Sequence, residues 1–213
     1  MKNKISEIRK EIEYIFNSQD STHDFDHTLR VCNLALHIAK IENADLEIIE
    51  VSSLLHDIAR HEQDKSKGKI CHAEKGGELA RSFLQKRGFE EDFIAKVVHA
   101  ITCHRFRGKN IPETLEAKIL FDADKLDGIG ATGIGRAFLF AGEHHAKLHS
   151  NEPNISPEAE YTKEDTAYRE FVVKLSKIKD KLFTTEAKRI AEGRHNFMVE
   201  FFDRLNYEID GII

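Results

Sequence analysis

The chain has 213 residues, 40% of them hydrophobic, and its 32 Lys and Arg residues face 37 Asp and Glu residues for a formal net charge of -5. This length and apolar content suffice for a buried core without disulfide or zinc staples. The mild negative charge provides no field that would hold a nucleic-acid backbone, so nucleic acid is not expected as a partner. The longest apolar runs, such as 137–141, fall far short of the roughly 20 residues that span a bilayer, so no membrane segment is predicted.

The first ten residues, MKNKISEIRK, are typical of a charged helix rather than a signal peptide, which predicts a cytoplasmic protein. The three cysteines, Cys32, Cys71 and Cys103, are widely spaced and form no Cys-x-x-Cys pair. We therefore expect three reduced thiols rather than a disulfide framework or a thiolate zinc site.

Long stretches rich in Ala, Leu, Glu, Lys and Ile, interrupted by only three prolines, favour helix over strand throughout the chain. In chain order, the predicted helices cover residues 3–17, 25–42, 45–60, 72–87, 90–105, 112–125, 133–149, 166–183 and 185–208. Asp45 is expected to cap the third helix and Gly88 to end the fourth. The polar segments 63–69 and 150–161 are predicted to be surface loops. The fold class is therefore all-α.

Histidine is frequent, and five of the twelve lie in segments otherwise dominated by Leu, Ile, Val and Ala: His27, His56, His72, His99 and His104. One such histidine alone is better explained as a core residue satisfied by hydrogen bonds. Taken together, however, their number in apolar surroundings directs attention to a common site.

The dipeptide His56-Asp57 ends an apolar segment and places an imidazole beside a carboxylate. Ser52 and Ser53, one turn earlier, are small and leave room for a ligand. Because adjacent residues of a helix point about 100° apart, one ion in the angle between them would contact both side chains. A buried Asp is costly unless it is paired or binds a metal.

A second acidic group, Asp122, Asp124 and Asp127, follows the apolar residues 119–121. One histidine, a His-Asp dyad and a buried acidic cluster in one small helical protein together favour a metal site with nitrogen and oxygen ligands.

Several motifs, in this order, resemble the HD-domain metal-dependent phosphohydrolases, whose signature is H...HD...D, and more narrowly a small bacterial branch of them. They read HDFDHTLRV (23–31), LLHDIAR (54–60), HAEKG (72–76), VVHAITCH (97–104) and DADKLDGIGATGIGR (122–136). The tail 174–198 is similar as well, so the likeness covers nearly the whole chain.

The resemblance implies one HD-type helical bundle over residues 1–213, with the metal-site core at about 20–130 and the C-terminal helices packed on it. It implies one divalent ion, which can be Mn, Mg, Fe, Co, Ni or Zn. The implied ligands are His27, His56, Asp57 and Asp124, with Asp122 as the alternative to Asp124. His23, Asp24 and Asp122 would brace these ligands from outside.

The same resemblance assigns roles to residues around the ion. His72 and His104 are candidates for proton transfer, with a role as core histidines equally open. In some branches, histidines at these positions bind a second metal that the Asp of the dyad bridges, whereas the close branch is similar to one-metal enzymes. Lys125 is the first candidate to neutralise phosphate charge.

Four cations near the C-terminal end, Arg136, Lys174, Lys181 and Arg194, are further candidates for substrate binding, with a solvated helix face as the alternative. The run His144-His145 with His149 has ligand-like spacing but is expected to be an exposed helix end. The residues 128–133 match G-x-G-x-x-G by letter. Without a predicted parallel sheet we interpret them as a tight turn between helices.

These features predict a divalent-metal-dependent phosphohydrolase that acts on a small nucleotide. The resemblance narrows this to a nucleoside triphosphate cut to monophosphate and pyrophosphate. Two alternatives stay open, a phosphodiesterase acting on cyclic or linear dinucleotides and a metal or nucleotide sensor without turnover. Fold alone does not choose among them.

Overall fold

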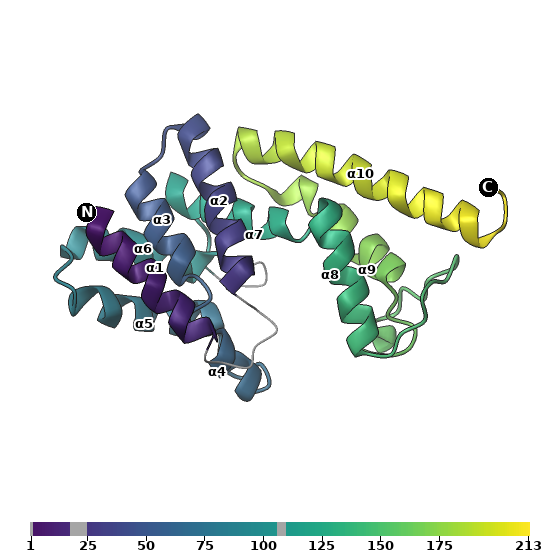
Figure 1. The fold of residues 1–213 in the computed structure, drawn as a ribbon, viewed down its shortest axis with the longest axis horizontal. Coiled ribbons are helices and arrows are strands. Elements are labelled where there is room, and N and C mark those ends of the chain that lie inside the picture. Colours follow the sequence, from purple (N-terminus) through teal and green to yellow (C-terminus); the bar gives the residue numbers. More distant parts are fainter. Residues whose placement is uncertain (1, 18–24, 106–109) are drawn as a thin grey trace. The chain divides into compact units, whose positions relative to one another are not determined.

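Helices form all the regular structure in the described part of the chain, which covers residues 2–17, 25–105 and 110–213 of a computed structural model (Figure 1). The all-α fold is thus confirmed. The elements are α1 Lys2–Asn17, α2 Phe25–Glu42, α3 Leu46–Leu55, α4 Arg60–Lys65, α5 His72–Gln85, α6 Glu91–Cys103, α7 Leu115–Asp127, α8 Gly130–Glu143, η1 Pro157–Ala159, α9 Ala167–Val173, η2 Leu175–Lys177, η3 Lys179–Lys181 and α10 Thr185–Ile209. Among the described helices, none has the length and apolar character needed to cross a membrane.

The chain divides into two compact units, Met1–Asp124 and Lys125–Ile213, and the boundary lies within α7. The first unit contains α1 to α6 and most of α7, and the second contains α8 to α10 with the short 3-10 turns. The expectation of one domain over 1–213 stays a prediction.

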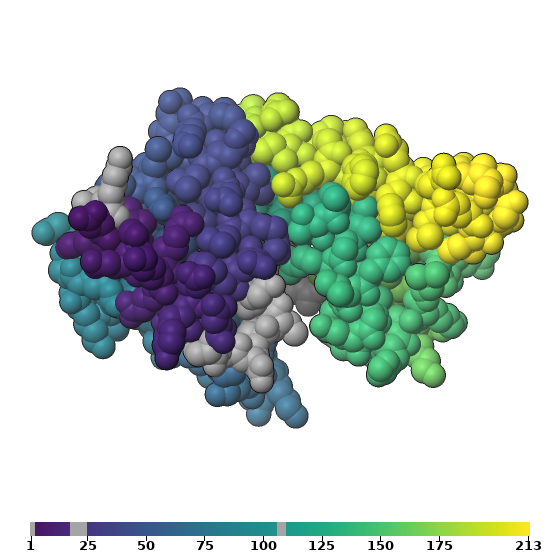
Figure 2. Space-filling model, viewed as in Figure 1, coloured from purple at the N-terminus to yellow at the C-terminus, as the bar shows by residue number. Residues whose placement is uncertain are grey.

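The core of the first unit is built where α1, α2, α3, α5 and α6 meet. In α1, Ile5, Ile8, Ile12 and Phe16 recur every three or four positions and are buried, which gives the helix one apolar face. In the space-filling view, α1 (purple) lies on the outside of this unit beside α2 (Figure 2). The buried cluster consists of Ile5, Ile8, Ile12, Phe16, Phe25, Cys32, Ile48, Val51, Leu54, Leu55, Ala80, Leu84, Phe89, Ile94, Val97 and Ile101.

Helix α3 begins as predicted and ends earlier than predicted. Asp45 caps it, because its Oδ1 accepts hydrogen bonds from the backbone N–H groups of Glu47 and Ile48 at 2.9 and 3.2 Å. The helix stops at Leu55, and residues 56–59 form a turn held by Ile58 N–H donating to the Leu55 carbonyl at 3.1 Å. The His-Asp dipeptide therefore lies in a turn after the helix.

Close packing of α5 on α6 depends on a glycine. A Cβ at Gly77 would lie 2.5 Å from the Cγ2 of Thr102 in α6, nearer than side chains tolerate. One residue earlier, Gly76 contacts the His56 carbonyl, at 3.4 Å from an added Cβ. The two glycines of HAEKGG thus let α5 approach both α6 and the turn that carries His56.

The second unit has an aromatic core between α8, α9 and α10. Phe202 of α10 is buried and stacks on Phe171 of α9, with ring centroids 4.8 Å apart. Phe138 of α8 and Tyr168 of α9 complete the group, at 6.5 and 5.5 Å from the Phe202 ring. These contacts explain why the tail keeps its apolar residues.

Some expected boundaries differ from the observed ones. The segment predicted as one helix over 166–183 is helical only to Val173 and then continues in 3-10 turns, whereas residues 63–65, predicted as loop, belong to α4. The helix predicted at 133–149 begins at Gly130 and ends at Glu143. After α5 ends at Gln85, Gly88 adopts a φ of +65°, the left-handed conformation that favours glycine.

The glycine-rich segment 128–133 includes the two-residue connection from α7 to α8, residues 128–129, and the first turn of α8. Gly130 has a φ of +78°, and a Cβ at Gly133 would lie 2.3 Å from the Gly128 carbonyl oxygen. No strand precedes this turn within the described residues, so the dinucleotide fingerprint does not apply.

Candidate metal centre

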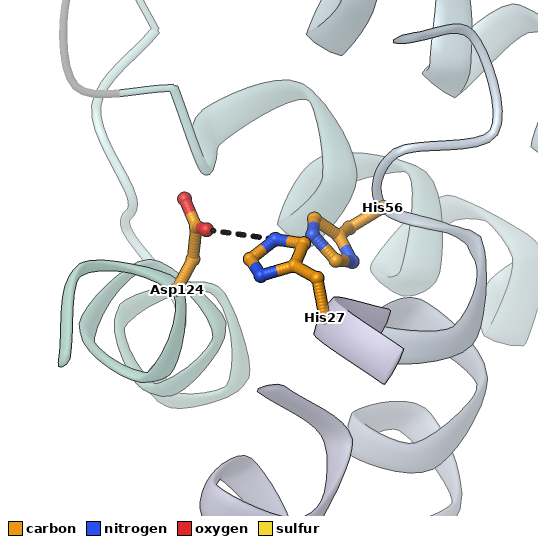
Figure 3. A group of neighbouring side chains, drawn as sticks. All are labelled: His27, His56 and Asp124. Carbon is orange, nitrogen blue, oxygen red and sulfur yellow. Dashed lines mark ion pairs between the residues drawn. The ribbon is translucent and has the colours of Figure 1, made fainter. Parts of the chain in front are cut away.

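Three segments far apart in sequence bring His27, His56 and Asp124 together. His27 lies in the first turn of α2, His56 directly follows α3, and Asp124 lies near the end of α7. One potential ligand atom from each residue lies within 4.8 Å of those of the other two. The three side chains point toward one another, with His27 Nε2 3.5 Å from Asp124 Oδ1 (Figure 3).

Asp57 lies at the centre of a larger group. Its Oδ2 is 3.8 Å from His27 Nε2 and 3.7 Å from His56 Nε2. Its Oδ1 is 3.4 Å from His72 Nε2 and 3.5 Å from His104 Nε2. One carboxylate thus faces four imidazoles, two with each oxygen. We call the six residues His27, His56, Asp57, His72, His104 and Asp124 the Asp57 cluster.

Within the cluster, Asp57, His72 and His104 form a second potential metal group. Their ligand atoms also lie within 4.8 Å of one another. His72 is the first residue of α5, and His104 is the residue after α6. Their Nε2 atoms are 3.0 Å apart. The close packing of α5 on α6 brings these two rings together.

Hydrogen bonds at Nδ1 determine which nitrogen of each ring carries the proton. Nδ1 of His56 donates to the Ser53 carbonyl at 2.7 Å, and Nδ1 of His104 donates to the Ile101 carbonyl at 2.6 Å. Nδ1 of His72 lies 2.8 Å from the Gln63 Oε1. Because carbonyl and amide oxygens only accept, all three Nδ1 atoms are donors, and each neutral ring presents a lone pair at Nε2.

Burial keeps two of these rings neutral. All six members except Asp124 are buried, and His56 is fully so. Burial lowers the pKa of His56 from 6.5 to about 4, while the charge of Asp57 opposes this. Burial also lowers the pKa of His72 to about 3, again against Asp57, with His104 and Arg60 lowering it further. The uncharged imidazole, the form that binds metals, therefore prevails at neutral pH.

The Nε2 acceptors of His56, His72 and His104 and the carboxylate oxygens of Asp57 face one another in the cluster, which is the pattern expected for a cation site. Nε2 of His56 is buried and makes no hydrogen bond with any described residue. Nε2 of His72 and Nε2 of His104, both acceptors, lie in contact and repel unless a proton or cation lies near them. Separations of 3.5 to 3.8 Å also suit two ligands that are each about 2 Å from one ion. The cluster could therefore hold a divalent metal.

Asp122 and Asp124 occupy different faces of α7, since residues two apart on a helix point about 200° apart. Asp124 is the one that joins the cluster, and Asp122 is fully buried. The role of Asp122 in bracing the site stays a prediction. His23 and Asp24, assigned the same role, lie outside the described residues.

The cations predicted to bind substrate belong to the second unit, and their role stays a prediction. Arg136 forms an ion pair with buried Asp127 at 3.0 Å. Arg194 donates to the Leu126 carbonyl, near the end of α7, and burial lowers its pKa although Asp127 opposes this. Lys125 is half-buried. Arg136 and Arg194 thus have structural partners close to the α7–α8 turn.

Further along the chain, Lys174 is exposed and pairs with Glu170 at 2.5 Å, and Lys181 is exposed at the end of η3. His144 and His145 follow the last residue of α8, and His145 is exposed, which agrees with a helix end. Neither they nor His149 belong to a potential metal group among the described residues.

Sequence reasoning missed Gln63, which contacts His72, and the carbonyls of Ser53 and Ile101, which orient His56 and His104. The carbonyls follow a simple rule, because each accepts from the histidine three residues later in the chain. Gln63 carries no such signal, since the intervening chain reverses direction between it and His72.

Comparison with known proteins identifies the family to which this chain is related. The HD-domain family model matches residues 24–129, the stretch that contains the whole Asp57 cluster. YpgQ of Bacillus subtilis (strain 168) is 36% identical over 210 residues, which cover 97% of this chain and 94% of YpgQ. The chain belongs to the HD-domain family.

This HD-domain chain also resembles solved structures over nearly all of its described length. The crystal structure of B. subtilis YpgQ in complex with ADP has a TM-score of 0.75 and 31% identity, covering 99% of this chain and 97% of that one. An HD-superfamily hydrolase from Bacillus thuringiensis has a TM-score of 0.78 and 29% identity, with 98% of both chains covered. The fold is thus that of HD-superfamily hydrolases.

Proposed function

We propose that the protein is a divalent-metal-dependent phosphohydrolase that acts on a small nucleotide. The observation that supports this most strongly is the Asp57 carboxylate between four imidazoles, three of which have Nδ1 engaged as a donor. Such a set of lone pairs and carboxylates binds a divalent cation with borderline ligands. The HD-domain fold and the ADP complex of YpgQ support a nucleotide as substrate.

In this proposal, His27, His56, Asp57 and Asp124 hold the cation. When bound, the cation supplies Lewis acidity to a phosphoryl oxygen and to the attacking water. The Nδ1–H bond of His56 to the Ser53 carbonyl fixes its ring and directs Nε2 into the cluster. Asp124 is the least buried of the four, so in this proposal a substrate approaches the cation from its side.

Proton transfer in this proposal falls to His72 and His104. Their Nε2 lone pairs are adjacent, so one ring accepts the proton of the attacking water and the second stabilises it by accepting a hydrogen bond. Lys125, directly after Asp124 in α7, is the proposed partner for the negative charge on the phosphates. For the narrowest substrate, a nucleoside triphosphate, water attacks the α-phosphorus, the bond to the bridging oxygen breaks, and pyrophosphate leaves.

A second candidate function has its own support. Asp57, His72 and His104 form a second potential metal group, and the contact of two Nε2 acceptors would be relieved by a cation between them. Two ions bridged by the Asp57 carboxylate would suit a phosphodiesterase acting on cyclic or linear dinucleotides. Counting the bound ions separates this candidate from the first, since one ion leaves both histidines available for proton transfer.

The test is a panel of nucleoside triphosphates, nucleoside diphosphates and dinucleotides incubated with Mn²⁺, with wild type beside Asp57→Ala. Products are identified by phosphorus NMR, and bound manganese is counted by elemental analysis after gel filtration. We expect monophosphate and pyrophosphate from a triphosphate, one ion per chain and no product from the variant. If wild type binds nucleotide but releases no product from any substrate, the protein is a sensor and the proposal is wrong.

A further inference from the structure

Gln63 of α4 contacts His72, a member of the Asp57 cluster, through its side-chain amide. Its Oε1 lies 3.3 Å from the backbone nitrogen of His72 and 2.8 Å from the Nδ1 of the same residue. A backbone N–H group can only donate, so the side-chain atom at this place is the amide oxygen and not the amide nitrogen. The orientation of the Gln63 amide is therefore determined by the main chain of α5.

This orientation decides the tautomer of His72. The amide oxygen accepts, so Nδ1 of His72 has to carry the proton, and in the neutral ring Nε2 then has a lone pair. In water, neutral histidine carries its proton mainly on Nε2. Gln63 therefore selects the less common tautomer and directs the lone pair toward Asp57 Oδ1 at 3.4 Å and His104 Nε2 at 3.0 Å.

The segment between Gln63 and His72 is folded so that this contact can form. The Gln63 carbonyl accepts from Ser66 Oγ at 2.9 Å and from Gly68 N–H at 2.9 Å, and Ser66 Oγ in turn accepts from Ile70 N–H at 3.0 Å. Gly68 has a φ of +80°, which turns the chain back toward α5. These bonds hold the main chain of Gln63 and leave its side-chain amide free to contact His72.

We propose that Gln63 is a positioning residue that holds His72 as the Nδ1–H tautomer and so keeps Nε2 available inside the Asp57 cluster. The tautomer follows from the contacts of Gln63 alone, whereas its consequence for catalysis rests on the proposed function. Without the amide oxygen, the ring reverts to the Nε2–H form, in which the same nitrogen can no longer accept a proton or bind a cation. Partners of this kind typically change activity or metal affinity by about 10- to 100-fold.

The experiment uses the full chain, metal-free and labelled with ¹⁵N-histidine, and records two-bond ¹H–¹⁵N NMR spectra at neutral pH. His72→Gln identifies the His72 signals by their loss. In wild type, we expect a pyrrole-type Nδ1 and a pyridine-type Nε2 for His72. Gln63→Met, which keeps the length of the side chain without the acceptor, should exchange the two types, and Gln63→Glu, which keeps an acceptor oxygen, should preserve the wild-type pattern.

Activity is measured on the same proteins with Mn²⁺ and the best substrate of the panel. We expect Gln63→Met to lower kcat by about 10-fold or more with little change in KM, and Gln63→Glu to recover much of the loss. Ser66→Ala is the matched control, because it loosens the same segment without removing the amide oxygen. It should lower the melting temperature while leaving the His72 tautomer and kcat as in wild type.

Two results would overturn the inference: an Nε2–H tautomer of His72 in wild type, or an unchanged tautomer in Gln63→Met. An equal loss of kcat in Ser66→Ala would also overturn it, because the segment as a whole would then be responsible. If wild type hydrolyses nothing, the proposed function fails, and the NMR spectra still decide whether Gln63 sets the tautomer.

Discussion

Both units of the molecule bury ionisable side chains, but the two regions differ in how these groups are satisfied. In the second unit, Arg169 donates to Asp165 Oδ1 at 2.8 Å and to the carbonyls of Asn154 and Ser156 at 2.6 and 2.7 Å. The remaining oxygen of Asp165 accepts from the Tyr161 N–H at 2.8 Å. In the Asp57 cluster of the first unit, by contrast, the Nε2 atoms of His72 and His104 face each other as two acceptors.

The difference separates a structural ion pair from the pattern expected of a cation site. Around Arg169, each donor meets an acceptor, so the pair holds the irregular segment 154–165 in place and needs no further ligand. Around Asp57, the Nε2 acceptors of three histidines face the carboxylate oxygens, and a cation would balance them. We call the group around Arg169 the balanced region and the Asp57 cluster the unbalanced region. Substitutions in the balanced region should lower the stability of the protein, and substitutions in the unbalanced region should lower its metal affinity.

The largest expected effect follows from removing the centre of the unbalanced region. Asp57→Ala deletes the carboxylate that faces all four imidazoles, so we expect Mn²⁺ affinity and product release to fall on the order of a thousandfold. Titration calorimetry and phosphorus NMR measure the two quantities. Asp165→Asn is the control from the balanced region and should leave Mn²⁺ affinity unchanged. Full activity in Asp57→Ala would contradict the assignment of the site.

The next effect belongs to the balanced region. Arg169→Met leaves Asp165 buried without its cation, so the free energy of unfolding should fall by about 3 to 5 kcal/mol in urea titrations. The double variant Arg169→Met/Asp165→Leu removes both charges and should regain much of this loss. Metal affinity should stay at the wild-type value in both proteins. A stability loss below about 1 kcal/mol would show that the pair is not a structural anchor.

The sequence also predicts the two regions to different extents. The spacing of apolar residues predicts α1 and α2 nearly to the residue, and the motifs around His27, His56, Asp57 and Asp124 predict residues that the fold brings together. The turn at 56–59 was not predicted, because local propensity favours helix through residue 60. The position of Asp57 depends on contacts from α2, α5 and α6, which local sequence does not contain.

Two other features were beyond sequence reasoning for the same reason. The contact of Gln63 with His72 depends on a chain reversal held by Ser66 and Gly68. The burial of Arg169, within a charged and unremarkable stretch, depends on carbonyls of the segment 150–161, which was predicted only as a surface loop. Long-range backbone partners have no local pattern from which they can be predicted.

Acid should weaken the unbalanced region of the metal-free protein. Burial lowers the pKa of His56 to about 4 and that of His72 to about 3, so below pH 6.5 the unfolded chain binds protons before the folded one. The stability contribution is fully present above pH 6.5 and is lost as the pH falls toward 4 for His56 and 3 for His72. At about 1.4 kcal/mol per pKa unit, the shift of His56 alone corresponds to a loss on the order of 3 kcal/mol across this window.

The measurement compares wild type with His56→Gln, which does not titrate, in urea at several pH values. As the pH falls from 6.5 to 4, the free energy of unfolding should fall more in wild type than in the variant. A pH-independent difference would show that His56 is not held neutral by burial.

The smallest effect is expected at an exposed ion pair. Lys174 pairs with Glu170 one turn away and is more than half exposed, so Lys174→Ala should change the free energy of unfolding by less than about 0.5 kcal/mol. The variant should also keep kcat/KM within about twofold, because we interpret this face of the molecule as solvated. Steady-state kinetics checks this, and a large rise in KM would instead place Lys174 among the substrate contacts.

The residue at position 77 affects the geometry of the Asp57 cluster although it lies outside the cluster. Because the side chain of Thr102 leaves no space for a Cβ there, Gly77→Ala would push α5 away from α6. His72 begins one of these helices and His104 follows the other, so the gap between their rings would widen with the helices. A single methyl group, placed outside the cluster, would thus change the 3.0 Å separation of the two Nε2 atoms.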